Sequence, residues 1–438
     1  MVQPTAPSVS SAADRPPVFQ GRAAGAFDFD VVVVGGGPCG ATAAWDLARA
    51  GLRVLLLDRA GRIKPCGGAV PPRLLEEFEV PQSLLVARAR AARMIAPSHR
   101  AVDMPVGETG YVGMVDREVF DEWLRARAAS AGAERRTGSF ERVEHDGLPG
   151  AVVCYGTARG GPLQRVRTRL VIGADGARSA VARGNVPGAE RNPCVFAYHE
   201  VIRAPEATPP GSNGLGFDGS RCDVIYQGRL SPDFYGWVFP HGATASIGVG
   251  SAHKGFSLRG AVQTMRDERG LARCETLRRE GAPIPLKPLR RWDNGRDLLV
   301  AGDAAGVVAP ASGEGIYYAM VCGRIAAQTA GTFLATGNPA VLRRARRDFL
   351  RLHGRVFWIL GIMQAVWYAS DRRRERFVAM CADRDVQQLT WQAYMNKRLV
   401  RARPLAHLRI FLKDCAHLLG IGRTAAVLPA SGEPGAAA

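Results

Sequence analysis

Apolar and polar positions near the start of the chain follow a pattern that predicts three consecutive elements. Phe29 to Val34 is a β-branched run suited to a strand buried on both faces, and a Gly-rich turn follows it. Residues 39–50 have a helical pattern that Gly51 closes, and Arg53 to Leu57 is a second buried strand. Strand, helix and strand in this order predict a parallel sheet.

Further along, the pattern changes twice. Residues 190–290 contain short alternating segments with turn residues between them, which predicts an antiparallel sheet inserted as a second domain. From about residue 340 the chain is helical, Arg-rich and aromatic. The other expected elements are a loop at 61–72, a helix over 115–131, strands at 164–174 and 297–302, and a helix over 315–334.

The predicted fold is therefore α/β, built from parts that are not contiguous in the sequence. We expect one domain from residues 28–85, 110–185 and 295–335, and an antiparallel-sheet domain from 86–109 and 190–290. A helical segment follows over 340–425. Residues 1–27 are rich in Ala, Pro, Ser and Gly and lack an apolar stretch, so we expect a disordered tail and no signal peptide.

The charge balance adds one expectation. Lys and Arg number 58 against 40 Asp and Glu, a formal net charge of +18 over 438 residues. This favours an anionic partner, and no nucleic-acid motif accompanies it, so a membrane surface is the partner that we expect. The run Val356 to Ala369 is shorter than the ~20 apolar residues of a spanning helix, which predicts a chain that is soluble or lies on a membrane.

The distribution of cysteine and histidine bears on redox and metal chemistry. Nine cysteines are scattered along the chain without a CxxC pair, and the eight histidines form no cluster. This spacing indicates neither a disulfide framework nor a metal site. A reducing cytoplasm suits such a chain best.

The first chemical motif is the turn Gly35-Gly36-Gly37-Pro38-Cys39-Gly40, which satisfies G-x-G-x-x-G. Gly35 allows a tight turn, Gly37 lets the backbone approach a pyrophosphate, and Gly40 lets the helix pack on the strand. The helix N-terminus offers free N–H groups to the phosphates. Asp58 ends the second strand, where it can bond a ribose hydroxyl. Together these features predict a dinucleotide site.

The second motif lies far downstream. A strand ends in Gly302-Asp303, and Gly313-Glu314-Gly315-Ile316 opens the next helix. A carboxylate at this place can accept a hydrogen bond from a ribityl hydroxyl, and the glycines and helix N-terminus can approach a flavin. The motif resembles the second FAD fingerprint of the aromatic-hydroxylase and geranylgeranyl-reductase superfamily. It decides for FAD over NAD as the resident cofactor.

A third motif strengthens this resemblance. Asp175-Gly176 follows the strand at 164–174, and in that superfamily an Asp-Gly turn here serves the flavin domain and sometimes the pyridine nucleotide. Arg117 matches a family arginine that reaches the FAD. Taken singly, the two are equally compatible with an ordinary β-turn and a surface arginine. Their order along the chain favours the functional interpretation.

Two further segments narrow the resemblance. Lys64-Pro-Cys66-Gly67 lies in the loop that runs near the isoalloxazine in this fold, and Tyr235-Gly-Trp237-Val-Phe239-Pro240 is followed after seven residues by Gly248-Val-Gly250. The second pattern, Y-x-W-x-F-P and then G-x-G, resembles the geranylgeranyl reductases. The segment from Lys64 and the long C-terminal part look most like the enzymes of chlorophyll and bacteriochlorophyll synthesis. The resemblance covers about residues 28–420.

The resemblance implies a glutathione-reductase or p-hydroxybenzoate-hydroxylase-like fold and an activity. The chain would saturate a geranylgeranyl chain to phytyl, on (bacterio)chlorophyll or on the diphosphate, with resident FAD and with NADPH as a transient donor. It would work in the cytoplasm, at the inner face of a photosynthetic membrane. The expected FAD-binding residues are Gly35, Gly37, Cys39, Gly40, Asp58, Cys66, Gly67, Arg117, Asp175, Gly176, Gly302, Asp303, Gly313, Gly315 and Ile316. The expected substrate-binding residues are Tyr235, Trp237, Phe239, Pro240, Gly248 and Gly250.

Several alternatives remain open at this stage. Tyr235, Trp237 and Phe239 share one face of a strand, which suits an apolar slot for a prenyl chain or a plain sheet core. Cys66 can act in catalysis beside the flavin or fill a tight turn. Other activities on the same scaffold are a flavin monooxygenase that hydroxylates an aromatic ring and a non-catalytic prenyl-binding escort.

The aromatic C-terminus also has two interpretations. Phe357, Trp358, Trp367 and Tyr368 stand near Arg372 to Arg374. Aromatic residues beside a basic cluster can lie on an anionic membrane. They can equally form a helical cap whose aromatic face packs on the main body.

Overall fold

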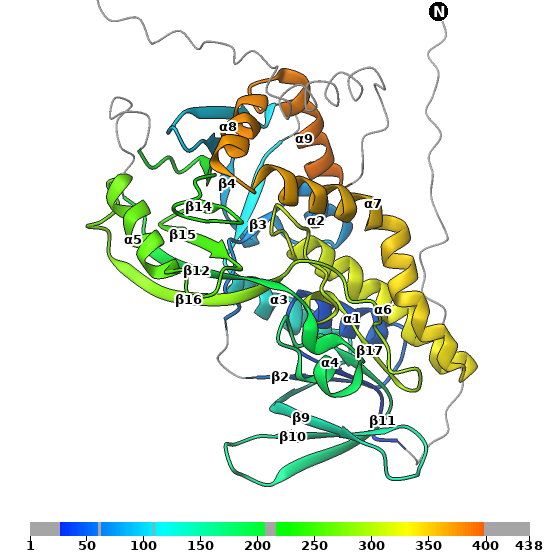
Figure 1. The fold of residues 1–438 in the computed structure, drawn as a ribbon. Helices are drawn as coiled ribbons and strands as arrows, with labels where there is room; N and C mark the ends of the chain where they lie inside the picture. Colours follow the sequence, from blue (N-terminus) through cyan, green and yellow to red (C-terminus); the bar gives the residue numbers. More distant parts are fainter. Residues whose placement is uncertain (1–26, 60–62, 108–109, 206–215, 398–438) are drawn as a thin grey trace, which may run out of the picture.

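The computed structural model describes residues 27–59, 63–107, 110–205 and 216–397. Apart from Phe27, the tail expected at 1–27 lies outside these residues, as does the part of the helical segment beyond 397. Within them, two seven-stranded sheets and a three-stranded sheet are joined by helices (Figure 1). No helix in the described part of the chain is long and apolar enough to cross a bilayer.

The first sheet has the order β8-β2-β1-β11-β10-β9, and β17 pairs with β11. The βαβ unit predicted from the sequence is present: β1 lies parallel to β2 and to β11, and α1 connects the first two strands. The central strands β1 and β2 are buried, with Val31 to Val33 and Leu55 to Leu57 almost fully covered. The strands are β1 (Phe29–Val34), β2 (Val54–Asp58), β8 (Glu134–Thr137), β9 (Ser139–Glu144), β10 (Ala151–Gly156), β11 (Leu163–Gly173) and β17 (Leu298–Val300).

The second sheet has the order β16-β12-β15-β14-β13-β5-β6. It is mixed and not purely antiparallel as predicted, because β5 lies parallel to β13. A parallel neighbour was not expected because a period-2 pattern carries no information about strand direction. The strands are β5 (Ala91–Ile95), β6 (Ala101–Pro105), β12 (Cys194–Arg203), β13 (Arg221–Ile225), β14 (Gly236–His241), β15 (Thr244–Ser251) and β16 (Thr276–Pro285).

A small sheet, β3-β7-β4, lies between these two parts in the sequence. Its strands are β3 (Ala69–Val70), β4 (Leu85–Ala89) and β7 (Val112–Val115). The helix expected over 115–131 begins two residues later than predicted, because Val115 still belongs to β7 and Asp116 caps the helix through the backbone N–H of Glu118. The helices that cover the first sheet are α1 (Pro38–Arg49), α3 (Arg117–Ser130), α4 (Ala180–Asn185) and α6 (Ile316–Thr336), and the short helix α2 (Pro72–Glu77) follows β3.

The second sheet has two different faces. Ile247, Val249 and Ala245 of β15 pack against α5 (Leu258–Glu268) in one apolar cluster. Because side chains alternate along a strand, Ser246, Gly248 and Gly250 lie on the other face. That face carries Trp237.

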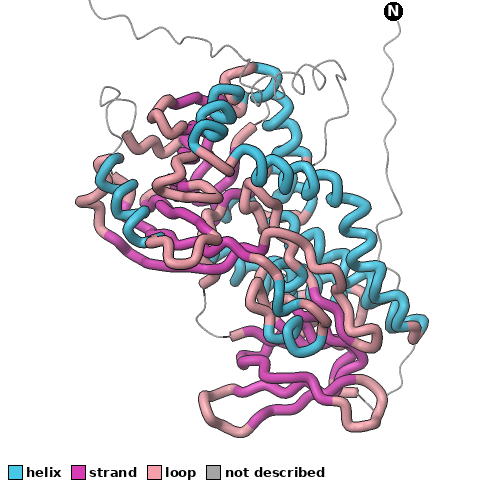
Figure 2. The backbone as a smooth tube through the Cα atoms, viewed as in Figure 1, coloured by secondary structure: helices cyan, strands magenta, loops and turns pink. Residues whose placement is uncertain are grey.

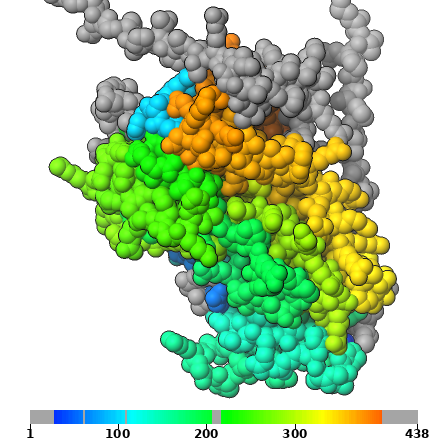
Figure 3. Space-filling view, viewed as in Figure 1, coloured from blue at the N-terminus to red at the C-terminus, as the bar shows by residue number. Residues whose placement is uncertain are grey.

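The C-terminal helices α7 (Arg344–Trp367), α8 (Asp371–Met380) and α9 (Arg384–Asn396) run from the first domain to the far end of the second sheet (Figures 1 and 2). In the space-filling view they form a continuous surface next to the second domain (Figure 3). Tyr368 and Phe377 pack on Tyr226, which in turn packs on Tyr235. The helices therefore join both domains.

The structure corrects the hypothesis of an aromatic membrane face at 357–368. Phe357, Trp367 and Tyr368 are buried against the body of the protein, and only Trp358 is exposed, at 68%. Among the arginines of the basic cluster, Arg374 is buried and donates to the carbonyls of Ser231 and Tyr368. A helix with apolar residues around its circumference does not reveal from sequence which side meets the protein.

Candidate FAD and substrate site

The first Gly-rich turn connects β1 to α1, and its glycines differ in function. Gly35 has a φ of +105°, and a Cβ there would overlap the Ala174 carbonyl. A Cβ on Gly40 would overlap the Gly35 carbonyl oxygen, so both residues are required for the turn itself. Gly37 is different, because nothing lies within 4 Å of its Cβ position. This open space beside the N-terminus of α1 fits a phosphate group.

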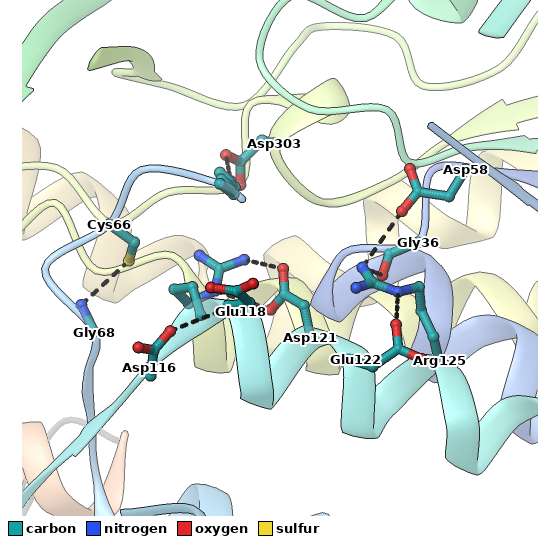
Figure 4. Close-up of polar contacts among 12 residues, drawn as sticks. Gly36, Asp58, Cys66, Gly68, Asp116, Glu118, Asp121, Glu122, Arg125 and Asp303 are labelled. Carbon is teal, nitrogen blue, oxygen red and sulfur yellow. Dashed lines mark hydrogen bonds and ion pairs between the residues drawn. The ribbon is translucent and has the colours of Figure 1, made fainter. Parts of the chain in front are cut away.

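Asp58 lies at the end of β2 and faces the same turn (Figure 4). A Cβ on Gly36 would lie 2.6 Å from its Oδ2 atom. Arg125 of α3 reaches this place, with Nη1 3.4 Å from Asp58 Oδ2 and 3.4 Å from the Gly36 carbonyl. Sequence reasoning missed Arg125, because the helical pattern of α3 does not say which of its arginines points to the turn.

The second motif approaches α1 from the other side. Gly302 has a φ of +62°, and a Cβ there would lie 2.8 Å from Cys39 Cβ. The Cys39 side chain is buried against Cys322, and that contact, followed by burial, raises the pKa of its thiol well above the ordinary value. Cys39 is therefore a packing residue that leaves only its backbone for a ligand.

Asp303 follows directly and is buried, with a side-chain exposure of 7%. It forms an ion pair with Lys64 from the loop before β3, a partner that the sequence did not indicate. Gly315, which precedes Ile316 at the start of α6, has its Cβ position 3.7 Å from Asp303 Oδ1. The loop of Lys64, the second motif and the start of α6 thus meet at Asp303.

Arg117 and Cys66 come together beside this place. Arg117, at the start of α3, donates two hydrogen bonds of 2.9 and 2.7 Å to Asp121. Although burial acts against its charge, Asp121 and then the Cys66 thiol raise the pKa of Arg117 above its ordinary value. Cys66 Sγ also accepts a hydrogen bond of 3.4 Å from the Gly68 backbone (Figure 4). The thiol therefore faces a fixed positive charge.

The Asp175-Gly176 turn has a structural function in the chain. Asp175 accepts hydrogen bonds from the backbone N–H groups of Ala180 and Val181 and from the Ser179 hydroxyl, so it caps α4. Burial raises the pKa of this carboxyl group. Gly176 has a φ of +88° and open space at its Cβ position.

A groove of about 230 Å³ lies next to this turn. Arg178 lines it from the loop before α4 and Arg183 from α4 itself, while Phe196 of β12 and Ala304 of the second motif line the other side. The Arg178 guanidinium lies 5.2 Å from the centre of the Phe196 ring. The groove therefore combines positive charge with an aromatic surface close to Asp303.

The aromatic row of Tyr235, Trp237 and Phe239 lies on one face of the second sheet, with ring centres 6.1 and 6.3 Å apart. Tyr235 precedes β14, which begins at Gly236, and its hydroxyl donates to the Ser312 carbonyl at 2.6 Å. A Cβ on Gly67 would lie 3.1 Å from the Phe239 ring. The aromatic row thus faces the loop that carries Cys66.

The three other residues expected to bind the substrate, Gly248, Gly250 and Pro240, do not all lie beside the aromatic row. Gly248 makes room for the row, because a Cβ there would overlap the Trp237 ring. A Cβ on Gly250 would lie 2.8 Å from Phe234, which stacks on Tyr235 at 4.3 Å and was not singled out from the sequence. Pro240 lies on the opposite face of β14 from Trp237 by strand alternation, so the structure does not bring it to the row.

Gly313 and Glu314 connect the second motif to the C-terminal helices. Gly313 has a φ of +64°, and its Cβ position lies 3.2 Å from the Tyr235 hydroxyl. Glu314 forms a buried ion pair with Lys397, whose ammonium group lies 3.7 Å from the centre of the Tyr394 ring. Burial raises the pKa of Glu314 and lowers that of Lys397. No sequence signal connected these two residues.

Comparisons with known proteins agree with this arrangement. Residues 28–189 match the family model described as FAD binding domain. The solved structure of a geranylgeranyl bacteriochlorophyll reductase-like protein from Thermoplasma acidophilum covers 90% of this chain and 98% of its own chain, with a TM-score of 0.74 and 23% identity. The predicted fold class is confirmed, and the chain carries an FAD-binding domain.

Similarity in sequence extends over nearly the whole chain. Geranylgeranyl diphosphate reductase of Rhodobacter capsulatus is 56% identical over 393 residues, which cover 90% of this chain and 98% of that protein. The chloroplastic geranylgeranyl diphosphate reductase of Oryza sativa subsp. japonica is 37% identical over 407 residues, covering 89% and 86%. The chain belongs to the geranylgeranyl diphosphate reductase family.

Proposed function

We propose that this protein reduces the isolated double bonds of a geranylgeranyl chain to give phytyl, with FAD as resident cofactor and NADPH as electron donor. The observation that carries the proposal is the approach of the aromatic row on β14 to Gly67, in the loop that also pairs with Asp303. An apolar wall thereby stands next to the predicted flavin site. Membership of the family adds independent support.

The residues present fit FAD. Gly37 leaves open space at a helix N-terminus for the diphosphate, and the buried Asp303 offers a carboxylate to ribityl hydroxyls. Asp58 is available to the ribose, and Arg117 and Gly315 border the same site. When bound and reduced, FAD supplies the hydride for the alkene.

The chain itself has to bind the prenyl group and exclude water. The rings of Tyr235, Trp237 and Phe239 present π faces, which attract the positive charge that develops on a trisubstituted alkene as it is reduced. We propose that Cys66 lies at the edge of this slot, where its thiol faces the Arg117 guanidinium. In this position Cys66 would have a catalytic function beside the isoalloxazine ring of the flavin.

The experiment is incubation of the FAD-loaded protein with NADPH and either geranylgeranyl pigment or geranylgeranyl diphosphate. Mass spectrometry should detect dihydro, tetrahydro and phytyl products from at least one of them. A product that contains added oxygen would identify a monooxygenase instead. A colourless purified protein without flavin absorbance would favour the prenyl-binding escort.

For NADPH we propose the groove beside α4. Arg178 and Arg183 can bind its phosphates, and Phe196 offers a ring for stacking. The double variant Arg178→Ala/Arg183→Ala should raise KM for NADPH about tenfold, or about 1.4 kcal/mol, with an unchanged yield of bound FAD. Arg165→Ala on β11, half-exposed and paired with Glu144, is the matched control. An unchanged KM in the double variant contradicts this site.

The membrane contact that we propose uses α7 in place of the aromatic face expected from the sequence. Leu352, Trp358 and Ile362 are exposed at 59%, 68% and 44%, and Arg351 and Arg355 lie beside them at helical spacing. A basic and apolar stripe of this kind binds anionic lipid at the cytoplasmic face of a membrane.

Flotation with phosphatidylglycerol vesicles tests the stripe. Trp358→Ala combined with Ile362→Ser should reduce binding at least tenfold, because each buried side chain contributes about 1.5–3 kcal/mol. Leu148→Ala removes an equally exposed apolar residue elsewhere, at 58% exposure, and should leave binding unchanged. Equal binding by all three proteins contradicts the contact.

A further inference from the structure

The face of the second sheet that carries the aromatic row also carries a line of cross-strand partners on four neighbouring strands. Glu280 on β16 is the cross-strand partner of His199 on β12, which is the partner of Gly248 on β15, which is the partner of Trp237 on β14. Residues in register across a sheet place their side chains on the same face. The line therefore leads from the sheet edge to the aromatic row.

The side chains along this line are within hydrogen-bonding distance. His199 Nε2 lies 3.0 Å from Glu280 Oε2, and His199 Nδ1 lies 3.0 Å from the Ser246 hydroxyl oxygen. Trp237 donates its indole N–H to the same oxygen at 3.1 Å. His199 and Ser246 are 3% and 2% exposed, so this chain of contacts is shielded from water. Ser246 belongs to the wall of the slot, since its partner across the sheet is Phe239.

Gly248 makes the connection possible. Its Cβ position lies 2.5 Å from His199 Cβ and would overlap the Trp237 ring. Any side chain there would separate the imidazole from the indole, whose ring centres are 6.2 Å apart. The glycine of the Y-x-W-x-F-P…G-x-G pattern thus allows the histidine to reach the aromatic wall.

The donors and acceptors along this chain of contacts determine where the hydroxyl hydrogen of Ser246 can point. The indole nitrogen is a donor only, so it occupies one lone pair of the Ser246 oxygen. When His199 is an imidazolium, Nε2–H faces the Glu280 carboxylate in an ion pair, and Nδ1–H donates to the second lone pair of Ser246. With both lone pairs occupied, the hydroxyl hydrogen of Ser246 must point away from both rings.

Charged groups also lie beyond Glu280, on the side of His199 away from Ser246. Glu280 Oε1 lies 3.4 Å from Arg278, which also pairs with the exposed Glu118 at 3.3 Å and with Asp116 at 4.0 Å. Although burial opposes the change, His199, Arg278 and Arg117 lower the pKa of Glu280, which keeps a carboxylate next to the imidazole.

His241 is the other titratable group near this line. Burial lowers its pKa, and His199 acts on it in the same direction. Its Nδ1 atom lies 3.2 Å from the carbonyl oxygen of Phe239.

We propose that Glu280, His199 and Ser246 form a proton relay, in which the His199 imidazolium supplies, through the Ser246 hydroxyl, the proton that saturates the prenyl double bond. The inference rests on the reductase activity proposed above. Saturating an alkene adds a hydride, which carries both electrons, to one carbon and a proton to the other. The hydride comes from the reduced cofactor, and the proton has to come from the chain.

The protons balance along the relay. The Ser246 hydroxyl gives its proton to the alkene carbon as the Nδ1 proton of His199 moves to the Ser246 oxygen. The serine is restored and His199 becomes neutral, with Nε2–H still facing Glu280. Once the reduced double bond has moved away, a proton from water in the slot reaches the Ser246 oxygen as the Ser246 proton passes to Nδ1 of His199, which restores the imidazolium before the next double bond is reduced. Ser246 is thus the donor that touches the substrate, and His199 and Glu280 act through it.

The test compares His199→Gln and Ser246→Ala with His253→Gln, a control on an exposed histidine just after β15. The rate at which geranylgeranyl substrate reoxidises the reduced holoprotein is measured between pH 5 and 9. We expect the wild-type rate to fall with rising pH in one step, and both relay variants to be about 10²–10⁴-fold slower without that step. FAD content and reduction by NADPH should stay unchanged, and the control should match the wild type.

A second measurement does not depend on activity. In the holoprotein labelled with ¹⁵N-histidine, His199 is assigned by its absence from His199→Gln. We expect both ring nitrogens to carry protons at low pH and only Nε2 at high pH, with the titration at the same pH as the rate step. Ser246→Ala is the second variant, in case His199→Gln does not fold. In Ser246→Ala the titration of the His199 ring should remain, while the rate of reoxidation by the substrate is lost.

The outcomes separate the two proposals. A wild-type protein that does not reduce either substrate contradicts the proposed function, while the NMR titration still tests the relay geometry. If the wild type is active and His199→Gln retains the rate and its pH step, the relay is wrong. A pH step that disappears in Cys66→Ser and persists in His199→Gln assigns the proton to Cys66 and also overturns the relay.

Discussion

The buried ion pair between Glu314 and Lys397 offers the most demanding test of how the C-terminal helices are attached. The pair connects the second FAD motif to the end of α9, and the side chains are 8% and 2% exposed. Lys397→Met keeps the length of the side chain and removes its charge. Glu314 then remains buried without a cation, and removing one partner of such a pair costs about 3–5 kcal/mol.

This cost can be converted to a melting temperature. An unfolding entropy of about 2.1 cal/mol/K per residue over the 438-residue chain gives about 1 °C per kcal/mol for unfolding as one unit. The apparent Tm of Lys397→Met should therefore fall by about 3–5 °C at pH 8. Differential scanning calorimetry of the holoprotein measures the change.

The loss should also depend on pH. Burial already raises the pKa of Glu314, and removing Lys397, which lowers it, raises it further. Because the folded pKa lies above the unfolded value of about 4.3, the protonated carboxyl is favoured in the folded state. The penalty is therefore small near pH 5 and grows as pH rises towards the folded pKa, so Lys397→Met should be closest to the wild type in acid.

Two further variants complete this experiment. Glu314→Gln combined with Lys397→Met removes both charges and should recover most of the lost stability. Lys254→Met replaces an exposed lysine and should melt with the wild type. A Lys397→Met protein that melts within 1 °C of the wild type at pH 8, or whose loss is the same at pH 5 and pH 8, would refute the reasoning.

Three other substitutions address the cofactor and the slot. Asp303→Asn should weaken FAD binding about 10- to 100-fold, as expected for the loss of about 1.5–3 kcal/mol of charge-assisted hydrogen bonding, and flavin fluorescence titration measures it; retained affinity would remove Asp303 from the site. Gly248→Ala should displace Trp237 at a cost of about 1–3 kcal/mol and abolish prenyl reduction while FAD remains bound; normal kcat would contradict the crowding. Cys66→Ser should keep FAD but slow turnover and lose the reactivity of the thiol towards iodoacetamide; equal turnover would leave Cys66 as a turn-filling residue.

Much of the candidate FAD site could be predicted because its signals are local. Gly35, Gly40 and Gly302 have to be glycine because a Cβ at each position would overlap atoms of the turn or of the neighbouring helix. Such constraints leave a motif that can be recognised in the sequence. Asp58 ends β2 and Asp303 lies in the first turn after β17, so both are placed at the carboxyl edge of a parallel sheet. The partners of these residues were not predictable. Lys64 and Arg125 are two of 58 basic residues, and only the folded chain selects them.

The sequence by itself determined the fold class, the resident flavin and the family, because each depends on contiguous patterns: β-branched runs, Gly-rich turns and the spacing of aromatic residues. Only the tertiary structure decided how the segments that carry these patterns contact one another. The direction of β5, the burial of Phe357, Trp367 and Tyr368, and the capping function of Asp175 depend on surfaces supplied by distant segments. The same holds for His199, Ser246 and Glu280, which lie on three strands and meet only because sheet register aligns them over a glycine. Local patterns encode backbone geometry, whereas side-chain contacts between strands depend on register, which no single segment contains.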